Sequence, residues 1–272
     1  MHDMSPFLPR ILILLAATGI SHDLCAQTYR ETDIPARHYG DFGGAFILYD
    51  RNADTYTRYH PQECDRRRSP ASTFKILNSL IGLETGVIAD EHFVIPWDSV
   101  PRWIPSWNRD HDLASAMANS VVWYYQELAR RVGEKRMQDY VTRVGYGNGD
   151  ISGGIDRFWL GSSIRISPTE QVELLRKLRD DRLPFSPRSL AIVKEILVLE
   201  RNDDYVLRGK TGFATERDSS AVGWFVGYVE KKENVYFFAC NVTSENARRD
   251  GEKIFATRKE ICLAILRDLG IL

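Results

Sequence analysis

Apolar stretches with the composition of β-strands lie near both ends of the chain. They are rich in Val, Ile, Phe, Tyr and Trp and cover residues 44–49, 55–59, 205–207, 221–229 and 234–242. The first two flank the polar stretch 50–54, which predicts an antiparallel hairpin. Because strands occur at both ends and helical patterns between them, we expect one antiparallel sheet that both ends of the chain build.

Helical patterns, with apolar residues at i, i+3 and i+4, fill the middle of the chain and its last segment. They cover residues 70–85, 111–144 in pieces, 168–180, 187–199 and about 251–269. Ser167, Pro168 and Glu170 mark one helix start, as N-cap, first helical residue and capping-box partner. The pattern predicts an α+β fold of mixed α/β type, in which an antiparallel sheet with flanking helices (about 27–68 and 200–272) carries an inserted all-helical subdomain (about 69–199).

The N-terminal stretch has the pattern of a secretory signal peptide. Arg10 precedes the apolar run 11–17, and the small residues around Ala26 offer a cleavage site. A membrane anchor is the alternative, but an apolar run of about ten residues is too short to span a bilayer, which needs about twenty. We therefore expect cleavage of residues 1–26 and a periplasmic mature protein; the pattern leaves open whether translation starts at Met1 or Met4.

The composition of the remaining chain, a single expected domain over residues 27–272, excludes several classes of function. It contains 35 basic and 35 acidic residues, so no nucleic-acid partner is expected. No second hydrophobic span follows the leader, so the mature chain should not cross a membrane. The six His residues show no metal-ligand spacing, so we expect no metal site. Cys64, Cys240 and Cys262 allow at most one disulfide.

The segment from Ser69 to Lys75 is the most informative one for chemistry. Ser69 is a credible N-cap and Pro70 a first helical residue, which places Ser72 in the first turn of a helix. Ser72 and Lys75 are three residues apart and share a helical face, so the amine can reach the hydroxyl. The Ser72 N–H lacks an intrahelical partner and can donate to a developing oxyanion. Taken alone, this S-x-x-K pattern is more often an ordinary amphipathic helix with a capping serine.

Two further short patterns bring hydroxyl and ammonium groups. Ser120 opens an S-x-V pattern, and taken alone it is more often a helix N-cap. Lys210, Thr211 and Gly212 form a K-T-G pattern after a strand, where glycine lets a ligand approach the backbone closely. A phosphate-binding loop is excluded, because its pattern needs glycine at position 204, which is Asp204 here.

In combination these patterns are more specific. S-x-x-K, then S-x-V, then K-T-G, in this order and at wide spacing, resemble the penicillin-recognising serine enzymes. Two triplets make the chain similar to the class D (oxacillinase-type) β-lactamases from about residue 40 to the C-terminus: Tyr146, Gly147 and Asn148, then Phe158, Trp159 and Leu160. Without the resemblance, residues 146–149 would be predicted to form only a turn.

The resemblance implies a serine β-lactamase in which Ser72 is the nucleophile. Class A relatives carry a catalytic Glu in the loop that corresponds to 150–167, but this stretch contains no Glu. The resemblance implies that Lys75 takes up carbon dioxide instead, becomes N6-carboxylysine, and deprotonates Ser72 and later a water. Carboxylation needs a neutral amine, whereas the pKa of an unperturbed lysine is about 10.4, and burial lowers it. The expected apolar pocket consists of Phe74, Val122, Trp159, whose indole N–H would donate to the carbamate, and Leu160.

The remaining roles also follow from the resemblance. Ser120 and Lys210 would relay the proton towards the β-lactam nitrogen, and the N–H of Phe213 would complete the oxyanion hole. Thr211, beside Gly212, and Arg258 would bind the substrate carboxylate; the alternative for Arg258 is a solvated helix charge. Gly209 departs from the Ser that many members carry before K-T-G, which leaves specificity open.

The expected substrates are penicillins, including the oxacillin type, with carbon dioxide or bicarbonate as the source of the carbamate and no other cofactor. A non-hydrolytic β-lactam sensor domain shares these motifs but usually follows several membrane spans. A cell-wall D,D-peptidase is usually longer and lacks the two triplets, and a pure binding module does not explain the joint motifs. The sequence leaves open the breadth of substrates and whether the protein is a monomer or a homodimer.

Overall fold

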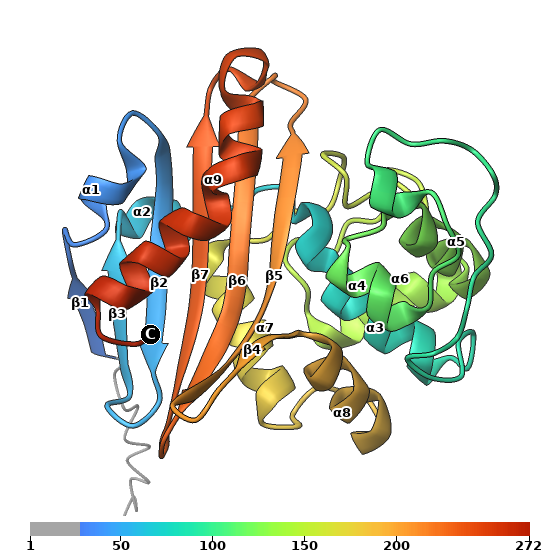
Figure 1. The fold of residues 1–272 in the computed structure, drawn as a ribbon, viewed down its shortest axis with the longest axis horizontal. Helices are drawn as coiled ribbons and strands as arrows, with labels where there is room; N and C mark the ends of the chain where they lie inside the picture. The colour runs from blue at the N-terminus through green and yellow to red at the C-terminus, as the bar shows by residue number, and fades with distance from the viewer. Residues whose placement is uncertain (1–27) are drawn as a thin grey trace, which may run out of the picture.

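A seven-stranded sheet forms the centre of the molecule in the computed structural model, which describes residues 28–272 (Figure 1). The expected signal peptide, 1–26, lies outside the described residues. The strands run in the order β1-β3-β2-β7-β6-β5-β4. Their bounds are β1 Thr28–Glu31, β2 Gly43–Asp50, β3 Thr55–Tyr59, β4 Val198–Arg201, β5 Tyr205–Thr215, β6 Ala221–Lys231 and β7 Asn234–Ser244.

The two ends of the chain meet in this sheet, as the sequence predicts. β2 and β3 form the expected antiparallel hairpin, and β2 also pairs antiparallel with β7. The sheet is antiparallel as expected except at one edge, where β1, a strand that was not predicted, pairs parallel with β3. The polar, exposed sequence of β1 has no alternating apolar face from which a strand could be predicted.

Helices surround the sheet, and their bounds agree with the predicted patterns in most places. They are α1 Ala36–Tyr39, α2 Pro61–Cys64, α3 Lys75–Glu84, α4 Leu113–Ala118, α5 Val122–Val132, α6 Glu134–Val144, α7 Pro168–Arg179, α8 Pro187–Ile196 and α9 Ala247–Asp268, with 3₁₀ turns η1 Ala71–Phe74 and η2 Pro105–Trp107. The capping box of Ser167 and Glu170 at the start of α7 is confirmed. The helix predicted over 187–199 is wrong at its end, because residues from 198 onward join the sheet as β4.

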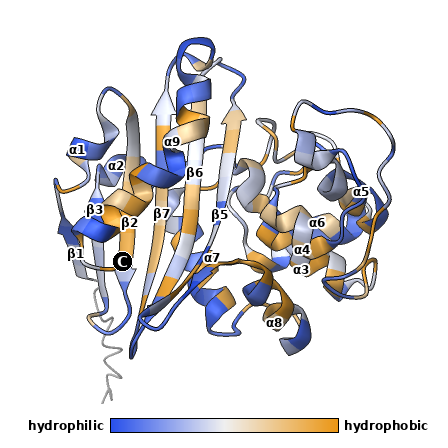
Figure 2. Ribbon diagram, in the orientation of Figure 1, coloured by the Kyte–Doolittle hydropathy of each residue, from blue (hydrophilic) through white to orange (hydrophobic). Residues whose placement is uncertain are grey.

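The sheet has a layer of helix on each face (Figure 1). α9 covers one face, where its Ile254 and Cys262 pack with Phe225 of β6. α7 packs on the other face with the β2 and β7 strands, although it lies within the stretch expected to form the helical subdomain. Figure 2 shows apolar residues on the central strands and polar residues on α1 at the outer edge. Because both faces of β6 are covered, the strand is almost continuously buried and reads as one apolar run.

The edge of the sheet at β5 faces the remaining helices, and this edge carries the K-T-G pattern. β4 pairs with β5 only as far as Arg208, so residues 209–215 lack a strand partner on that side. The Gly209 N–H donates to the Leu197 carbonyl oxygen at 2.9 Å, away from β6. Strand geometry repeats every two residues, so the N–H groups of Thr211 and Phe213 point to the same open side, towards η1.

The cysteines and the lengths of the helices test two further expectations. Cys64, Cys240 and Cys262 are buried free thiols, so the one disulfide that the sequence allows is not present. Within residues 28–272, no helix combines the length and the apolar character needed to cross a membrane.

Candidate active site

The predicted nucleophile lies at the start of α3, in the short turn that precedes it. Ser72 belongs to η1, so its place in a first helical turn is confirmed. The expected N-cap role of Ser69 is wrong. Its hydroxyl instead donates to the Trp159 carbonyl oxygen at 3.1 Å and accepts the Gly161 N–H at 2.9 Å. Through these hydrogen bonds Ser69 connects residues 69–74, which we call the nucleophile turn because they contain the predicted nucleophile, to the segment that carries Trp159.

Four polar side chains from three separate segments meet at this turn. Lys75 Nζ lies 2.6 Å from Ser72 Oγ and 3.4 Å from Ser120 Oγ. Lys210 Nζ lies 3.0 Å from the same Ser120 hydroxyl. Ser120 has a left-handed φ of 54° between α4 and α5, and α5 has no side-chain cap. The structure thus brings together the four residues that the sequence proposed as catalytic, and the N-cap alternative for Ser120 fails.

The two lysines lie in an environment that disfavours their charged forms. Lys75 is fully buried, and desolvation lowers its pKa well below the usual value, with a further contribution from the charge of Lys210. Burial lowers the pKa of Lys210 to about 7, helped by the positive charge of Arg258. The Lys75 amine also lies 5.4 Å from the centre of the Tyr125 ring. Its surroundings are hydroxyls and aromatic carbon, which cannot compensate an ammonium charge as a carboxylate would.

The expected apolar pocket beside Lys75 is largely aromatic. Phe74 stacks on Trp159 with ring centroids 5.6 Å apart, and Phe158 lies edge-on to Phe74 at 4.9 Å. The indole nitrogen of Trp159 is buried without a hydrogen-bond partner. Val122 and Leu160 are only half-buried and pack at the border of the same core. The Trp159 N–H is therefore an unsatisfied buried donor, which is rare in a protein interior and calls for an acceptor.

The Tyr146-Gly147-Asn148 triplet forms a turn that is hydrogen-bonded to the later segment 163–165. Tyr146 packs edge-on against Phe74 at 5.3 Å. Gly147 has a φ of 53°, and a Cβ there would lie 1.9 Å from the Arg165 carbonyl oxygen. The Asn148 side chain accepts the Arg165 N–H at 2.9 Å and donates to the Ser163 carbonyl oxygen at 3.0 Å. The turn interpretation thus describes the backbone correctly, and its packing connects it to the pocket.

The K-T-G strand, β5, and the predicted arginine, Arg258, lie on the sheet side of the site, next to η1. A Cβ on Gly212 would lie 3.0 Å from the Pro70 carbonyl oxygen, so glycine permits the close approach of β5 to η1. Lys210, Thr211 and Arg258 line one hollow of about 590 Å³, and Phe213 follows on the same strand. Arg258 lies on α9, and burial lowers its pKa to about 10. Its placement beside this hollow contradicts a fully solvated helix charge.

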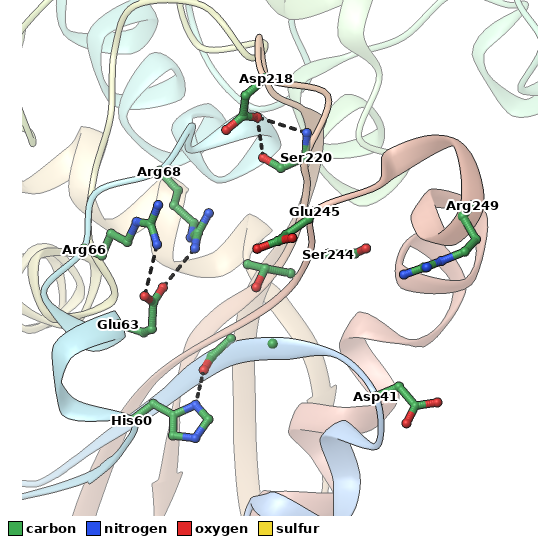
Figure 3. A pocket seen from close by; sticks show the side chains of 13 residues that line it. Asp41, His60, Glu63, Arg66, Arg68, Asp218, Ser220, Ser244, Glu245 and Arg249 are labelled. Carbon is green, nitrogen blue, oxygen red and sulfur yellow. Dashed lines mark hydrogen bonds and ion pairs between the residues drawn. The ribbon is translucent and has the colours of Figure 1, made fainter.

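A second hollow, of about 680 Å³, lies at the ends of β2 and β7 and contains none of the predicted site residues (Figure 3). In Figure 3 the guanidinium groups of Arg66 and Arg68 both point to Glu63, the latter at 2.9 Å. Acidic and basic side chains line it together and no lysine is among them; its Ser220 hydroxyl donates to the Asp218 carboxylate at 2.6 Å within an exposed turn. Among residues 28–272, no group of three or more His, Cys, Asp or Glu could hold a metal ion. The serine–lysine cluster is therefore the candidate active site.

Sequence reasoning missed one residue that supports this site. The buried carboxylate of Glu216 accepts the Ser69 N–H at 2.8 Å and pairs with Arg165 at 2.6 Å. It thereby links the loop after β5 to the nucleophile turn. No local motif marks Glu216, because its partners lie 147 and 51 residues away in the sequence.

Comparisons with known proteins agree with this geometry. Residues 43–266 match the family model of the penicillin binding protein transpeptidase domain. The β-lactamase OXA-48 of Klebsiella pneumoniae is 44% identical over 232 residues, which cover 85% of this chain and 87% of that protein. A crystal structure of the class D β-lactamase YbXI from Nostoc has a TM-score of 0.81 at 42% identity and covers 88% of this chain and 99% of its own. The regulatory protein BlaR1 of Bacillus licheniformis is 39% identical over 228 residues, which cover 84% of this chain but 37% of that protein.

Proposed function

The chain belongs to the class D β-lactamases, which are serine hydrolases, and from this we propose how it works and on what: it opens the β-lactam amide of penicillins, including the oxacillin type, through an acyl-enzyme on Ser72 with carboxylated Lys75 as the general base. The observation that carries the proposal is the fully buried Lys75 amine, 2.6 Å from the Ser72 hydroxyl. A lysine that is neutral at this place can act as a base and can be carboxylated.

The surroundings of Lys75 support carboxylation over a free amine. A neutral amine adds to carbon dioxide and loses one proton, which leaves a carbamate with two oxygen acceptors. The unpartnered Trp159 indole N–H, held beside Phe74, would then gain an acceptor. The carbamate supplies a base for the Ser72 proton during acylation and for a water proton during deacylation. The negative charge of the carbamate on Lys75 would lie near the Lys210 amine, and a protonated Lys210 would balance it.

The other side chains have roles that follow from their positions. The N–H groups of Ser72, in η1, and of Phe213, on the β5 strand that packs against η1, would stabilise the oxyanion of the tetrahedral intermediate. Ser120 lies between the two lysines and would pass a proton to the β-lactam nitrogen as the ring opens. Thr211 and Arg258 would bind the substrate carboxylate in their shared hollow.

The test is a bicarbonate titration of activity. Purified protein should hydrolyse benzylpenicillin with repeated turnover, lose activity in buffer depleted of carbon dioxide, and regain it when bicarbonate is added. A panel with oxacillin, cephalosporins and carbapenems then defines the substrate range. Activity that does not respond to removal of carbon dioxide at pH 6 or 7 would contradict the carboxylated base, while leaving Ser72 as the nucleophile.

A non-hydrolytic β-lactam sensor is the second candidate, because a regulatory protein is 39% identical over 84% of this chain. A sensor forms the same Ser72 adduct but does not release it. Intact-mass measurements after mixing with a stoichiometric amount of benzylpenicillin distinguish the two. An adduct that disappears within seconds supports the hydrolase, and one that persists for hours supports the sensor.

We also propose export through cleavage after Ala26 and action in the periplasm on β-lactam antibiotics, as a monomer or homodimer. We further propose that the chain divides into a sheet part (about 27–68 and 200–272) and a helical part (about 69–199), with the catalytic cluster where the two parts would meet. Mass spectrometry of protein from the periplasmic fraction tests the cleavage site, and light scattering measures the oligomeric state.

A further inference from the structure

Two exposed aromatic side chains meet beside the hollow that contains Arg258. Trp103, in the loop before η2, is 76% exposed, and Phe255, on α9, is 37% exposed. Their ring centroids lie 6.0 Å apart at 60°, an edge-to-face geometry. The loop belongs to the helical part of the molecule and α9 covers the sheet. The pair, which we call the aromatic bridge, therefore connects the two parts at the end of the site where the carboxylate is proposed to bind.

The Phe255 ring also contacts two residues of the proposed site. Its ring lies edge-on to Phe213 at 5.7 Å and 89°. The guanidinium carbon of Arg258 lies 4.1 Å from the ring centre, a cation–π contact. Phe255 and Arg258 are three residues apart on one helix, so they share a face. The flat ring thus supports the guanidinium from one side and removes water from that side.

Arg258 is held by this ring and not by an acidic partner. Its Nε atom is buried without a hydrogen-bond partner, and among residues 28–272 no carboxylate lies within ion-pair distance of it. The nearby Lys210 supplies no negative charge either, and the Arg258 charge helps to lower its pKa. A partly buried cation without a counter-ion needs an anion from outside the chain. The direction in which the Arg258 guanidinium points then depends on the groups that pack against it.

We propose that Phe255 is a positioning residue that holds the Arg258 guanidinium towards the substrate carboxylate, and that Trp103 completes the aromatic bridge and shields this ion pair from water. The inference rests on the proposed role of Arg258. It adds two residues, neither of them in a sequence motif, that set how tightly a carboxylate-bearing β-lactam binds. Trp103 acts through Phe255 and by covering the hollow, and neither residue takes part in proton transfer.

The proposal predicts a change in binding and not in the chemical step. The substrate carboxylate is bound equally well before and during ring opening. A weaker contact between Arg258 and this carboxylate therefore raises KM and leaves kcat nearly unchanged. Phe255→Ala should raise KM for benzylpenicillin about 5- to 10-fold, in line with one cation–π contact in a partly desolvated site. Phe255→Tyr keeps the ring and should restore KM to within about twofold of the original value. Trp103→Ala should raise KM about threefold, because it exposes the ion pair without removing its support.

The experiment compares benzylpenicillin with its methyl ester, which has no carboxylate charge. Phe255→Ala should leave kcat/KM for the ester nearly unchanged while lowering it for the acid. In the Arg258→Ala background, Phe255→Ala should have no further effect on the acid. Val100→Ala changes an exposed side chain of the same loop that makes no ring contact and is the matched control.

Three results would overturn the proposal: equal losses with acid and ester, no rescue by Tyr, or a full additional loss in the Arg258→Ala background. Binding is also measured apart from turnover, by calorimetric titration of Ser72→Ala protein with benzylpenicillin, with and without Phe255→Ala. An unchanged Kd there refutes the role of Phe255 even if the enzyme turns over. A wild-type protein that binds benzylpenicillin but never hydrolyses it refutes the proposed function and leaves the bridge to be judged from Kd alone.

Discussion

Trp159→Phe is the substitution that tests the carboxylated base most directly. Trp159 is fully buried and stacks on Phe74, and its indole N–H is a buried donor without a partner. Phenylalanine keeps an aromatic ring at this place and removes only the donor and part of the ring volume. If the N–H binds the carbamate on Lys75, the change removes one hydrogen bond to a charged acceptor.

The expected size of the effect follows from the strength of such a bond. A hydrogen bond to a charged group contributes about 1.5–3 kcal/mol. Since about 1.4 kcal/mol corresponds to a factor of ten, the bicarbonate concentration that gives half-maximal activity should rise about 10- to 100-fold. At saturating bicarbonate, kcat should largely recover, because the base forms again once its weaker binding is overcome.

The assay is the initial rate of penicillin hydrolysis in carbon dioxide-depleted buffer against added bicarbonate. Trp123→Phe is the matched control, because Trp123 is also buried but its indole N–H already donates to the Trp107 carbonyl oxygen at 2.8 Å. That variant should lose stability without changing the bicarbonate requirement. Equal half-saturating concentrations for wild type and Trp159→Phe would remove the indole from the carbamate site and refute the reasoning.

Three further predictions follow from the same contacts. Lys75→Ala should acylate slowly and hardly deacylate, so that the benzylpenicillin adduct persists in intact-mass spectra; unchanged turnover would exclude Lys75 as the base. Ser69→Ala should lower the free energy of unfolding by about 1–3 kcal/mol in urea titrations, because it loses the hydrogen bonds to residues 159 and 161, and it should raise the bicarbonate requirement, which a mere helix cap would not do. Burial lowers the pKa of Lys210 to about 7, so between pH 7 and about 10.4 the unfolded chain binds more protons and stability rises with pH. The gain in Tm from Lys210→Met should therefore be largest near pH 7 and shrink towards pH 10, and a gain that stays constant with pH would contradict a depressed pKa.

Local sequence was sufficient to predict a structural feature wherever the interaction that stabilises the feature is between residues close together in the chain. The hairpin of β2 and β3, the capping box of Ser167 and Glu170, and the spacing of Ser72 and Lys75 depend on neighbours in the chain. The strands β1 and β4 were not predictable in this way. β1 is stabilised by pairing with β3, and β4 continues an apolar pattern that also suits the end of α8. Tertiary pairing overrides such weak local preferences.

The sequence by itself determined the family of the protein and the proposed chemistry, because the proposed nucleophile, the two lysines and the K-T-G strand are recognisable as short motifs in a fixed order. Only the tertiary structure decided their surroundings. It placed Ser120 between two lysines, left the Trp159 donor without a partner, anchored Ser69 to Glu216 and brought Trp103 to Phe255. The physical reason is that a pKa, an unsatisfied donor or a ring contact depends on what packs around a group in space, and those neighbours come from segments that are far apart in the chain.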